Sequence, residues 1–221
     1  WLETSITFQR QYSVQYNIYI YTYKQPKSLY YIYSLYKQKY ISQPFRQRIN
    51  TIAKMSLSNT TTIKVNWDLE LRKATLKGKV NEIHLAIEKG ANIHRSLKGK
   101  WTYLHLAARN KQAAALKTLI ECGANINAKK DDGATSLHVA CSAGYLSITK
   151  VLVDNNIDIR ARNKHGDTAL HLAANFGHID LVTYLMETNS SIIFRNNYGS
   201  TPIHLAAANG HVKVVSALLN Y

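Results

Sequence analysis

The sequence has few of the residues that build disulfide-rich or membrane-spanning proteins. Only two of its 221 residues are cysteine, Cys122 and Cys141. Two are too few for a disulfide framework, so we expect both to be free, buried and in a reducing compartment, the cytoplasm. No run of about 18 apolar residues is present, and we predict no membrane span. A basic region followed by an aliphatic core is also missing, so no signal peptide is expected.

Acidic residues are scarce: 13 Asp and Glu stand against 28 Lys and Arg, giving a net charge of +15. The acids are scattered, and the adjacent pair Asp131 and Asp132 falls in a predicted turn. Hydrolase G-x-S-x-G, phosphate-loop and H-E-x-x-H motifs are all absent. We therefore predict no enzymatic activity, no cofactor, no metal and no small-molecule substrate.

Residues 1–54 differ in composition from the rest. They hold eight Lys and Arg against one acid, Glu3, and ten of the fifteen tyrosines, but no Gly, Asp, Cys, His or Met. Three interpretations stay open: a poorly ordered extension, a β-prone edge segment, or a reading frame extended upstream of a true start at Met55. A genuine segment of this kind would suit single-stranded nucleic acid, since its tyrosines stack and its lysines neutralise phosphates.

From Asn66 onward the sequence repeats every 33 residues. A Thr-x-Leu-His or Thr-x-Ile-His motif recurs at Thr102, Thr135, Thr168 and Thr201. One glycine column holds Gly133, Gly166 and Gly199, and a second holds Gly78, Gly144, Gly177 and Gly210, with Lys111 as the exception. A third column contains only Gly or Asn: Gly90, Gly123, Asn156 and Asn189. Each unit therefore predicts a turn, a helix, a second helix and a loop.

Each recurring residue type has a physical role in such a unit. Glycine permits the turn, and the threonine hydroxyl caps the first helix. The third column supplies the left-handed residue that ends the second helix. The histidines belong to different units, so they cannot share a metal ion. We expect each histidine to hydrogen-bond the backbone of its turn.

The motif from Gly199 to Ala207, and its copy from Gly166 to Ala174, resembles the ankyrin repeat family. The resemblance implies an all-α solenoid of stacked helix-turn-helix units with short β-hairpin loops. We expect a linker at 55–66 and an array at 67–221, divided into 67–99, 100–132, 133–165, 166–198 and a partial unit 199–221. The first unit is polar and atypical, as a capping repeat should be. The last stops within its second helix, so we expect Leu205 and Val214 to lack a partner, and more repeats or another domain to follow.

The resemblance also implies binding of another protein through the hairpin tips and the concave face of the first helices. Ten residues are predicted to contact the partner: Arg95, Lys98, Arg109, Lys129, Lys130, Arg162, Lys164, Phe176, Arg195 and Tyr198. We expect Phe176 to lie beside Tyr198 as an aromatic anchor. Bases outnumber acids at the tips, so a partner with an acidic face is expected.

Two alternatives remain for the function. The chain is the recognition part of a longer ankyrin-rich effector or arthropod toxin-like protein, which would be secreted, or it binds nucleic acid through its basic surface. The second alternative is disfavoured, because nearly half of the net positive charge lies in residues 1–54.

Overall fold

Paired helices make up the described part of the chain, residues 65–188 and 194–220 of a computed structural model. The first helices of the pairs, here called inner helices, are α4 (Trp67–Lys77), α6 (Tyr103–Arg109), α8 (Ser136–Ser142), α10 (Ala169–Asn175) and α12 (Pro202–Ala208). The outer helices are α5 (Val80–Glu88), α7 (Ala113–Glu121), α9 (Leu146–Asp154), α11 (Ile179–Thr188) and α13 (Val212–Leu219).

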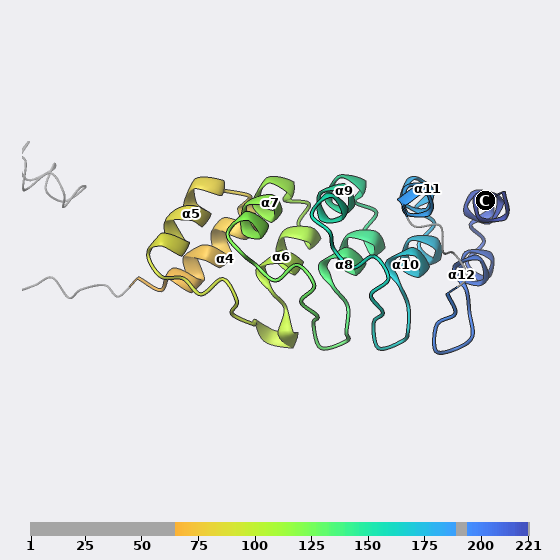
Figure 1. The fold of residues 1–221 in the computed structure, drawn as a ribbon, viewed down its shortest axis with the longest axis horizontal. Helices are drawn as coiled ribbons and strands as arrows, with labels where there is room; N and C mark the ends of the chain where they lie inside the picture. The colour runs from red at the N-terminus through yellow and green to blue at the C-terminus, as the bar shows by residue number, and fades with distance from the viewer. Residues whose placement is uncertain (1–64, 189–193, 221) are drawn as a thin grey trace, which may run out of the picture. The chain divides into compact units, whose positions relative to one another are not determined.

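Each inner helix contacts the next inner helix, and each outer helix the next outer helix, so the pairs stack in two layers (Figure 1). The predicted all-α repeat solenoid is confirmed. The expected extension at 1–54 and most of the expected linker lie outside the described residues.

Threonine begins four of the inner helices, as predicted. Thr102, Thr135, Thr168 and Thr201 are the N-cap residues of α6, α8, α10 and α12. Helix α4 instead starts after Asn66, whose side-chain oxygen accepts the backbone N–H of Leu69 at 3.1 Å. It has 11 residues, whereas α6 has seven. The first unit is thus atypical at its helix start as well as in its sequence.

Left-handed residues follow the outer helices where the third column predicts them. Gly90, Gly123 and Asn156 have φ angles of 95°, 90° and 61°. Glycine takes this conformation freely, and asparagine tolerates it better than most residues. Asn189 lies outside the described residues.

The second glycine column is needed for close approach between repeats. A Cβ atom on Gly177, at φ +75°, would come within 2.6 Å of Nδ1 of His211 in the next unit. Lys111 occupies the same column at φ 56°. There the next unit supplies Tyr145 instead of histidine, and the Lys111 ammonium lies 5.6 Å from the tyrosine ring centre. The exception at Lys111 is therefore matched by a change in its neighbour.

The core lies between the two helix layers and runs through every repeat. Leucines of the inner helices, such as Leu104 and Leu137, are buried together with alanines of the neighbouring turn, such as Ala107 and Ala140. Small alanines let adjacent inner helices approach closely, so the core is continuous along the stack. Cys141 is fully buried, as expected. The expectation for Cys122 is wrong: it is only half-buried, because it lies just past the end of α7.

Hairpins connect each outer helix to the next inner helix and project beside the stack (Figure 1). We call them finger 1 (95–101), finger 2 (128–134), finger 3 (161–167) and finger 4 (194–200). A backbone hydrogen bond joins the two sides of each finger, for example from the Lys130 N–H to the Ala134 carbonyl at 3.0 Å, and fingers 2, 3 and 4 each contain a second one within the turn. Finger 1 also contains a 3-10 turn, η1 (Lys98–Lys100). The hairpins are short, and residues 65–188 and 194–220 contain no β-strand.

The last helix pair differs from the prediction in one respect. Leu205 is partly exposed, as expected, but Val214 is 1% exposed because it faces the core. The exposed apolar side chains of α13 are instead Val212 and Leu219, at 73% and 70%. In the described part of the chain, no helix has the length and apolar character needed to cross a bilayer.

Candidate partner-binding surface

Three of the recurring histidines, His105, His138 and His171, fix their inner helices to the next finger. In His138, Nδ1 accepts the backbone N–H of Thr135 at 3.2 Å and lies 2.9 Å from its hydroxyl oxygen. The other ring nitrogen, Nε2, donates to the Asp167 carbonyl of finger 3 at 3.0 Å. His105 and His171 make the equivalent bonds to Ala134 and Ser200. The prediction that the histidines bond the turn backbone is confirmed.

These bonds require a neutral imidazole, with its proton on Nε2. Burial lowers the pKa values of His105, His138 and His171, because the charged ring is disfavoured away from water. The three rings are therefore structural links at neutral pH. They hold the fingers in a fixed orientation relative to the inner helices.

A second set of bonds, the basic ladder, joins neighbouring fingers through Lys129 and Arg162. The Lys129 ammonium donates to the Arg162 carbonyl at 3.3 Å, and the Arg162 guanidinium donates to the Arg195 carbonyl at 2.6 Å. Arg162 and Arg195 also donate to the Gly166 and Gly199 carbonyls of their own fingers. Three of the predicted contact residues thus stabilise the fingers themselves.

Two more of the predicted contact residues form ion pairs within the chain. Arg95 is bonded to Asp68 of α4, and Lys130 to Asp132 of its own finger. The backbone N–H of Asn92 and then the Arg95 guanidinium lower the pKa of Asp68. Both cations are therefore partly neutralised before any partner arrives.

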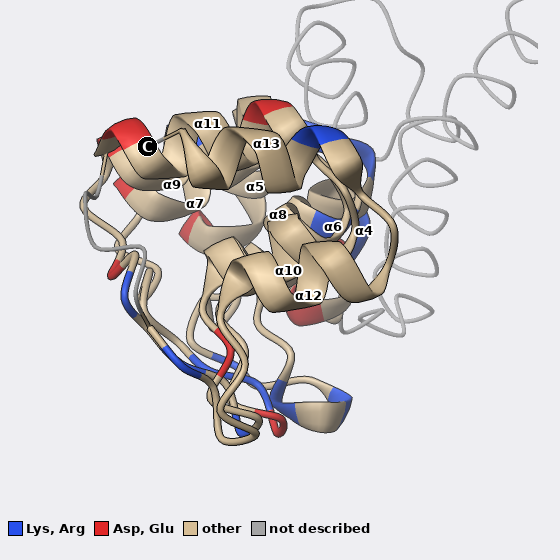
Figure 2. Cartoon of the chain, turned by 90° about the vertical axis from the view of Figure 1, so that its right-hand side faces the viewer, with Lys and Arg blue, Asp and Glu red and all other residues tan. Residues whose placement is uncertain are grey.

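Lys98 and Lys164 are the basic fingertip residues that keep their charge available. Neither has an ion pair with a carboxylate among the described residues. Lysines and arginines gather along the fingers, with fewer acids between them (Figure 2). The fingers therefore present a basic surface on which only part of the charge is free.

Trp101, at the base of finger 1, is a surface residue that the repeat pattern did not single out. The Arg109 guanidinium lies 5.4 Å from its ring centre and the Lys130 ammonium 5.5 Å. His105 meets the ring edge-on at 5.8 Å. Cations attracted by the indole ring are held in place here. The only signal in the sequence was a tryptophan directly before a capping threonine.

Phe176 and Tyr198 are both exposed, at 51% and 74%, but they do not form one anchor. Phe176 caps the end of α10 and stacks on His178 at 6.4 Å. Tyr198 lies in finger 4, stacked on His165 at 6.1 Å, with its hydroxyl 3.1 Å from Nδ1 of that histidine. The expectation that they lie side by side is wrong, because the inner helix separates its C-cap from the finger.

Comparison with known proteins agrees with the repeat geometry. A search of curated proteins finds no match to the chain. A family model described as ankyrin repeats (3 copies) matches residues 71–163 and 137–221. Proteins with such repeats generally serve in protein–protein interaction and are typically not enzymes. The two matched segments span most of the chain and coincide with the stacked helix pairs, so the chain belongs to the ankyrin repeat family.

Proposed function

We propose that this chain is a non-catalytic scaffold that binds another protein through its fingers and inner helices. The supporting observation is that hydrogen bonds spaced one repeat apart fix the fingers to the helices and to one another. A surface held in place before binding loses little conformational entropy when a partner docks. The proposal applies equally to a free-standing protein and to the recognition part of a longer effector or toxin-like protein.

The partner we propose has an acidic face. Lys98 and Lys164 carry unpaired charges on the fingers, and Arg109 lies over the Trp101 ring without a carboxylate partner among the described residues. Charges at the rim of an interface mainly steer association and select the partner. Nucleic acid is a poorer fit, since phosphate binding needs many free cations and the basic ladder and ion pairs engage several of them.

The test compares two charge-reversed full-length variants. Lys98→Glu with Lys164→Glu changes the fingers, whereas Lys150→Glu with Lys213→Glu makes the same charge change on the outer helices α9 and α13. A displayed library of protein segments is selected on the unmodified chain, and the affinities of the selected segments are measured on both variants.

We expect the selected segments to be acidic. The finger variant should bind these segments with about tenfold lower affinity, because each reversed charge costs roughly 0.7 kcal/mol. The outer-helix variant should leave them nearly unchanged. Equal loss in both variants, or none in the finger variant, contradicts the acidic partner. Failure to select any segment contradicts the scaffold itself.

A further inference from the structure

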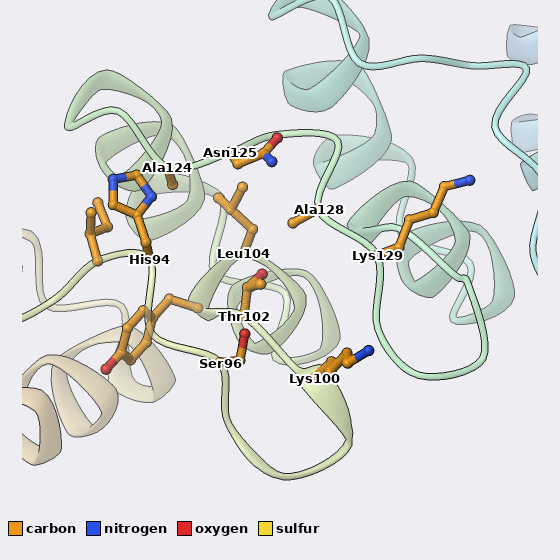
Figure 3. A pocket seen from close by; sticks show the side chains of 11 residues that line it. His94, Ser96, Lys100, Thr102, Leu104, Ala124, Asn125, Ala128 and Lys129 are labelled. Atoms are coloured by element: carbon orange, nitrogen blue, oxygen red, sulfur yellow. The ribbon is translucent and has the colours of Figure 1, made fainter.

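A pocket of about 230 Å³ opens at the bases of fingers 1 and 2. Its apolar lining includes Leu104 of α6 and Ala124 and Ala128 of the loop after α7. Figure 3 shows Asn125 on the loop after α7 and Ser96 on finger 1, with Lys100 further along the finger. The pocket is thus built by the first two repeats of the described array.

The position of the pocket follows from a gap in the basic ladder. Lys129 bridges finger 2 to finger 3, and Arg162 bridges finger 3 to finger 4. The residue one repeat before Lys129 is Ser96, which is too short to reach the Lys129 carbonyl. The Lys129 side chain itself leads away from the pocket toward the next finger (Figure 3). The first junction therefore stays open where the next two are crossed.

The side chains that line the pocket include hydrogen-bond donors and cations but no anion. Its polar side chains include the Ser96 hydroxyl, the Asn125 amide and the Lys100 ammonium, and it contains no carboxylate. Lys100 has only a distant ion pair, 3.9 Å from Asp131. The Ser96 hydroxyl has no hydrogen-bond partner among the described residues. Such a lining matches an apolar group that carries a carboxylate beside it.

The size of the pocket further restricts which ligands can bind. Sites for drug-sized molecules and cofactors enclose about 300–1,000 Å³, and this pocket is smaller. It suits one side chain, and partly enclosed side-chain pockets are where protein interfaces gain much of their affinity. The pocket therefore fits an anchor residue of a protein partner better than a free metabolite.

We propose that this pocket binds an apolar side chain of the partner that lies next to a carboxylate. The apolar group rests on Leu104, Ala124 and Ala128, and the carboxylate accepts hydrogen bonds from Ser96 and Lys100. The proposal rests on the proposed function only in taking the partner to be an acidic protein. It adds a second contact region beside the contacts proposed for Lys98 and Lys164.

The probe is a capped tripeptide, acetyl-Glu-Phe-Glu-amide, titrated into the isotopically labelled full-length chain and followed by amide NMR signals. Acetyl-Glu-Gly-Glu-amide lacks the apolar anchor, and acetyl-Lys-Phe-Lys-amide lacks the carboxylates. We expect the first peptide to shift the signals of Ser96, Thr102, Ala124 and Ala128. Its affinity should exceed that of each of the others about tenfold, from burial of the phenyl group and from its charge.

The deciding variant is Ser96→Arg, which places the ladder residue of the later repeats at the first junction. The new guanidinium should donate to the Lys129 carbonyl, as Arg162 donates to Arg195, and fill the pocket. It should lower Glu-Phe-Glu affinity to that of Glu-Gly-Glu. General attraction to a basic surface predicts the opposite result, because the variant adds a positive charge. Ser147→Arg adds the same charge on α9 and should leave the affinity unchanged.

Unchanged or tighter Glu-Phe-Glu binding by Ser96→Arg overturns the pocket proposal, as do signal shifts confined to other repeats. Such a result leaves the scaffold proposal standing if Lys98→Glu with Lys164→Glu still weakens the selected acidic segments. If Lys98→Glu with Lys164→Glu does not weaken the selected segments but Ser96→Arg still weakens Glu-Phe-Glu binding, the pocket is supported and the fingertip contacts are contradicted.

Discussion

Replacing His138 with alanine should cost far more stability than the same change at His204, although the two occupy the same position in their repeats. Both imidazoles accept from their N-cap threonine, with Nδ1 2.9 Å from the Thr135 hydroxyl oxygen and 2.6 Å from that of Thr201. Only His138 also reaches across to the next finger, at the Asp167 carbonyl. His138 is 1% exposed, whereas the His204 side chain is exposed.

The expected costs follow from these contacts. Loss of the link to the N-cap removes about 1 kcal/mol in either variant. His138→Ala also leaves the Asp167 carbonyl without its donor in a partly buried site, which costs about 2 kcal/mol more. We therefore expect about 3 kcal/mol for His138→Ala and about 1 kcal/mol for His204→Ala. The difference reflects the bond between repeats together with the burial of the His138 ring.

The assay is urea unfolding of the full-length chain at pH 7.5, followed by circular dichroism. The two variants are compared only if their transitions have the same slope, since separate unfolding of the last repeat would reduce the slope. Equal free-energy losses in the two variants would refute the reasoning. They would mean that the histidine acts only within its own helix and does not couple neighbouring repeats.

Three further predictions concern stability. As pH falls through about 6.5, the free energy of unfolding should decrease by up to about 1.4 kcal/mol per pH unit for each buried histidine. The lowered pKa values keep these rings neutral in the folded chain, whereas the histidines of the unfolded chain bind protons. This contribution to stability is therefore present above pH 6.5 and lost below it. Urea midpoints that do not change from pH 7.5 to 5.5 contradict this prediction. Gly177→Ala should cost about 2 kcal/mol more than Gly210→Ala in thermal unfolding: both sites have positive φ, but only the first would press a Cβ onto His211. Ser96→Arg should raise the free energy of unfolding by about 1 kcal/mol by extending the basic ladder, and a lower urea midpoint would argue against the bridge to Lys129.

Most of the fold could be predicted because the residue type needed at each helix start or helix end recurs in several repeats. A threonine column fixed the start of four inner helices, and the Gly and Asn column fixed the left-handed residues after the outer helices. Lys111 could only be noted as an exception. Its left-handed backbone and its contact with Tyr145 involve two units at once, and the comparison of single columns does not reveal such a pair.

The candidate surface was harder to predict, because the sequence shows which residues vary but not what they already bond. Arg162 and Arg195 are charged and lie in the fingers, where the sequence differs between repeats, so they were predicted to contact a partner. In the structure both donate to finger carbonyls. Phe176 and Tyr198 were paired because both are exposed aromatic residues, yet Phe176 follows the last residue of α10 and Tyr198 lies in finger 4. The pocket also escaped prediction, since it depends on the shortness of one side chain, Ser96, relative to its counterparts.

A charged residue of a repeat array is available to a partner only if its own neighbours leave it free. At the ladder position, the basic side chains of Lys129 and Arg162 donate to a carbonyl of the next finger, so each charged group is held at that junction. At the tips, Lys98 and Lys164 have no such acceptor in reach among the described residues. A short residue at the ladder position has the opposite effect, because it leaves a hollow between two fingers that the partner can fill. The specificity of this surface should therefore depend as much on Ser96 as on any of its lysines.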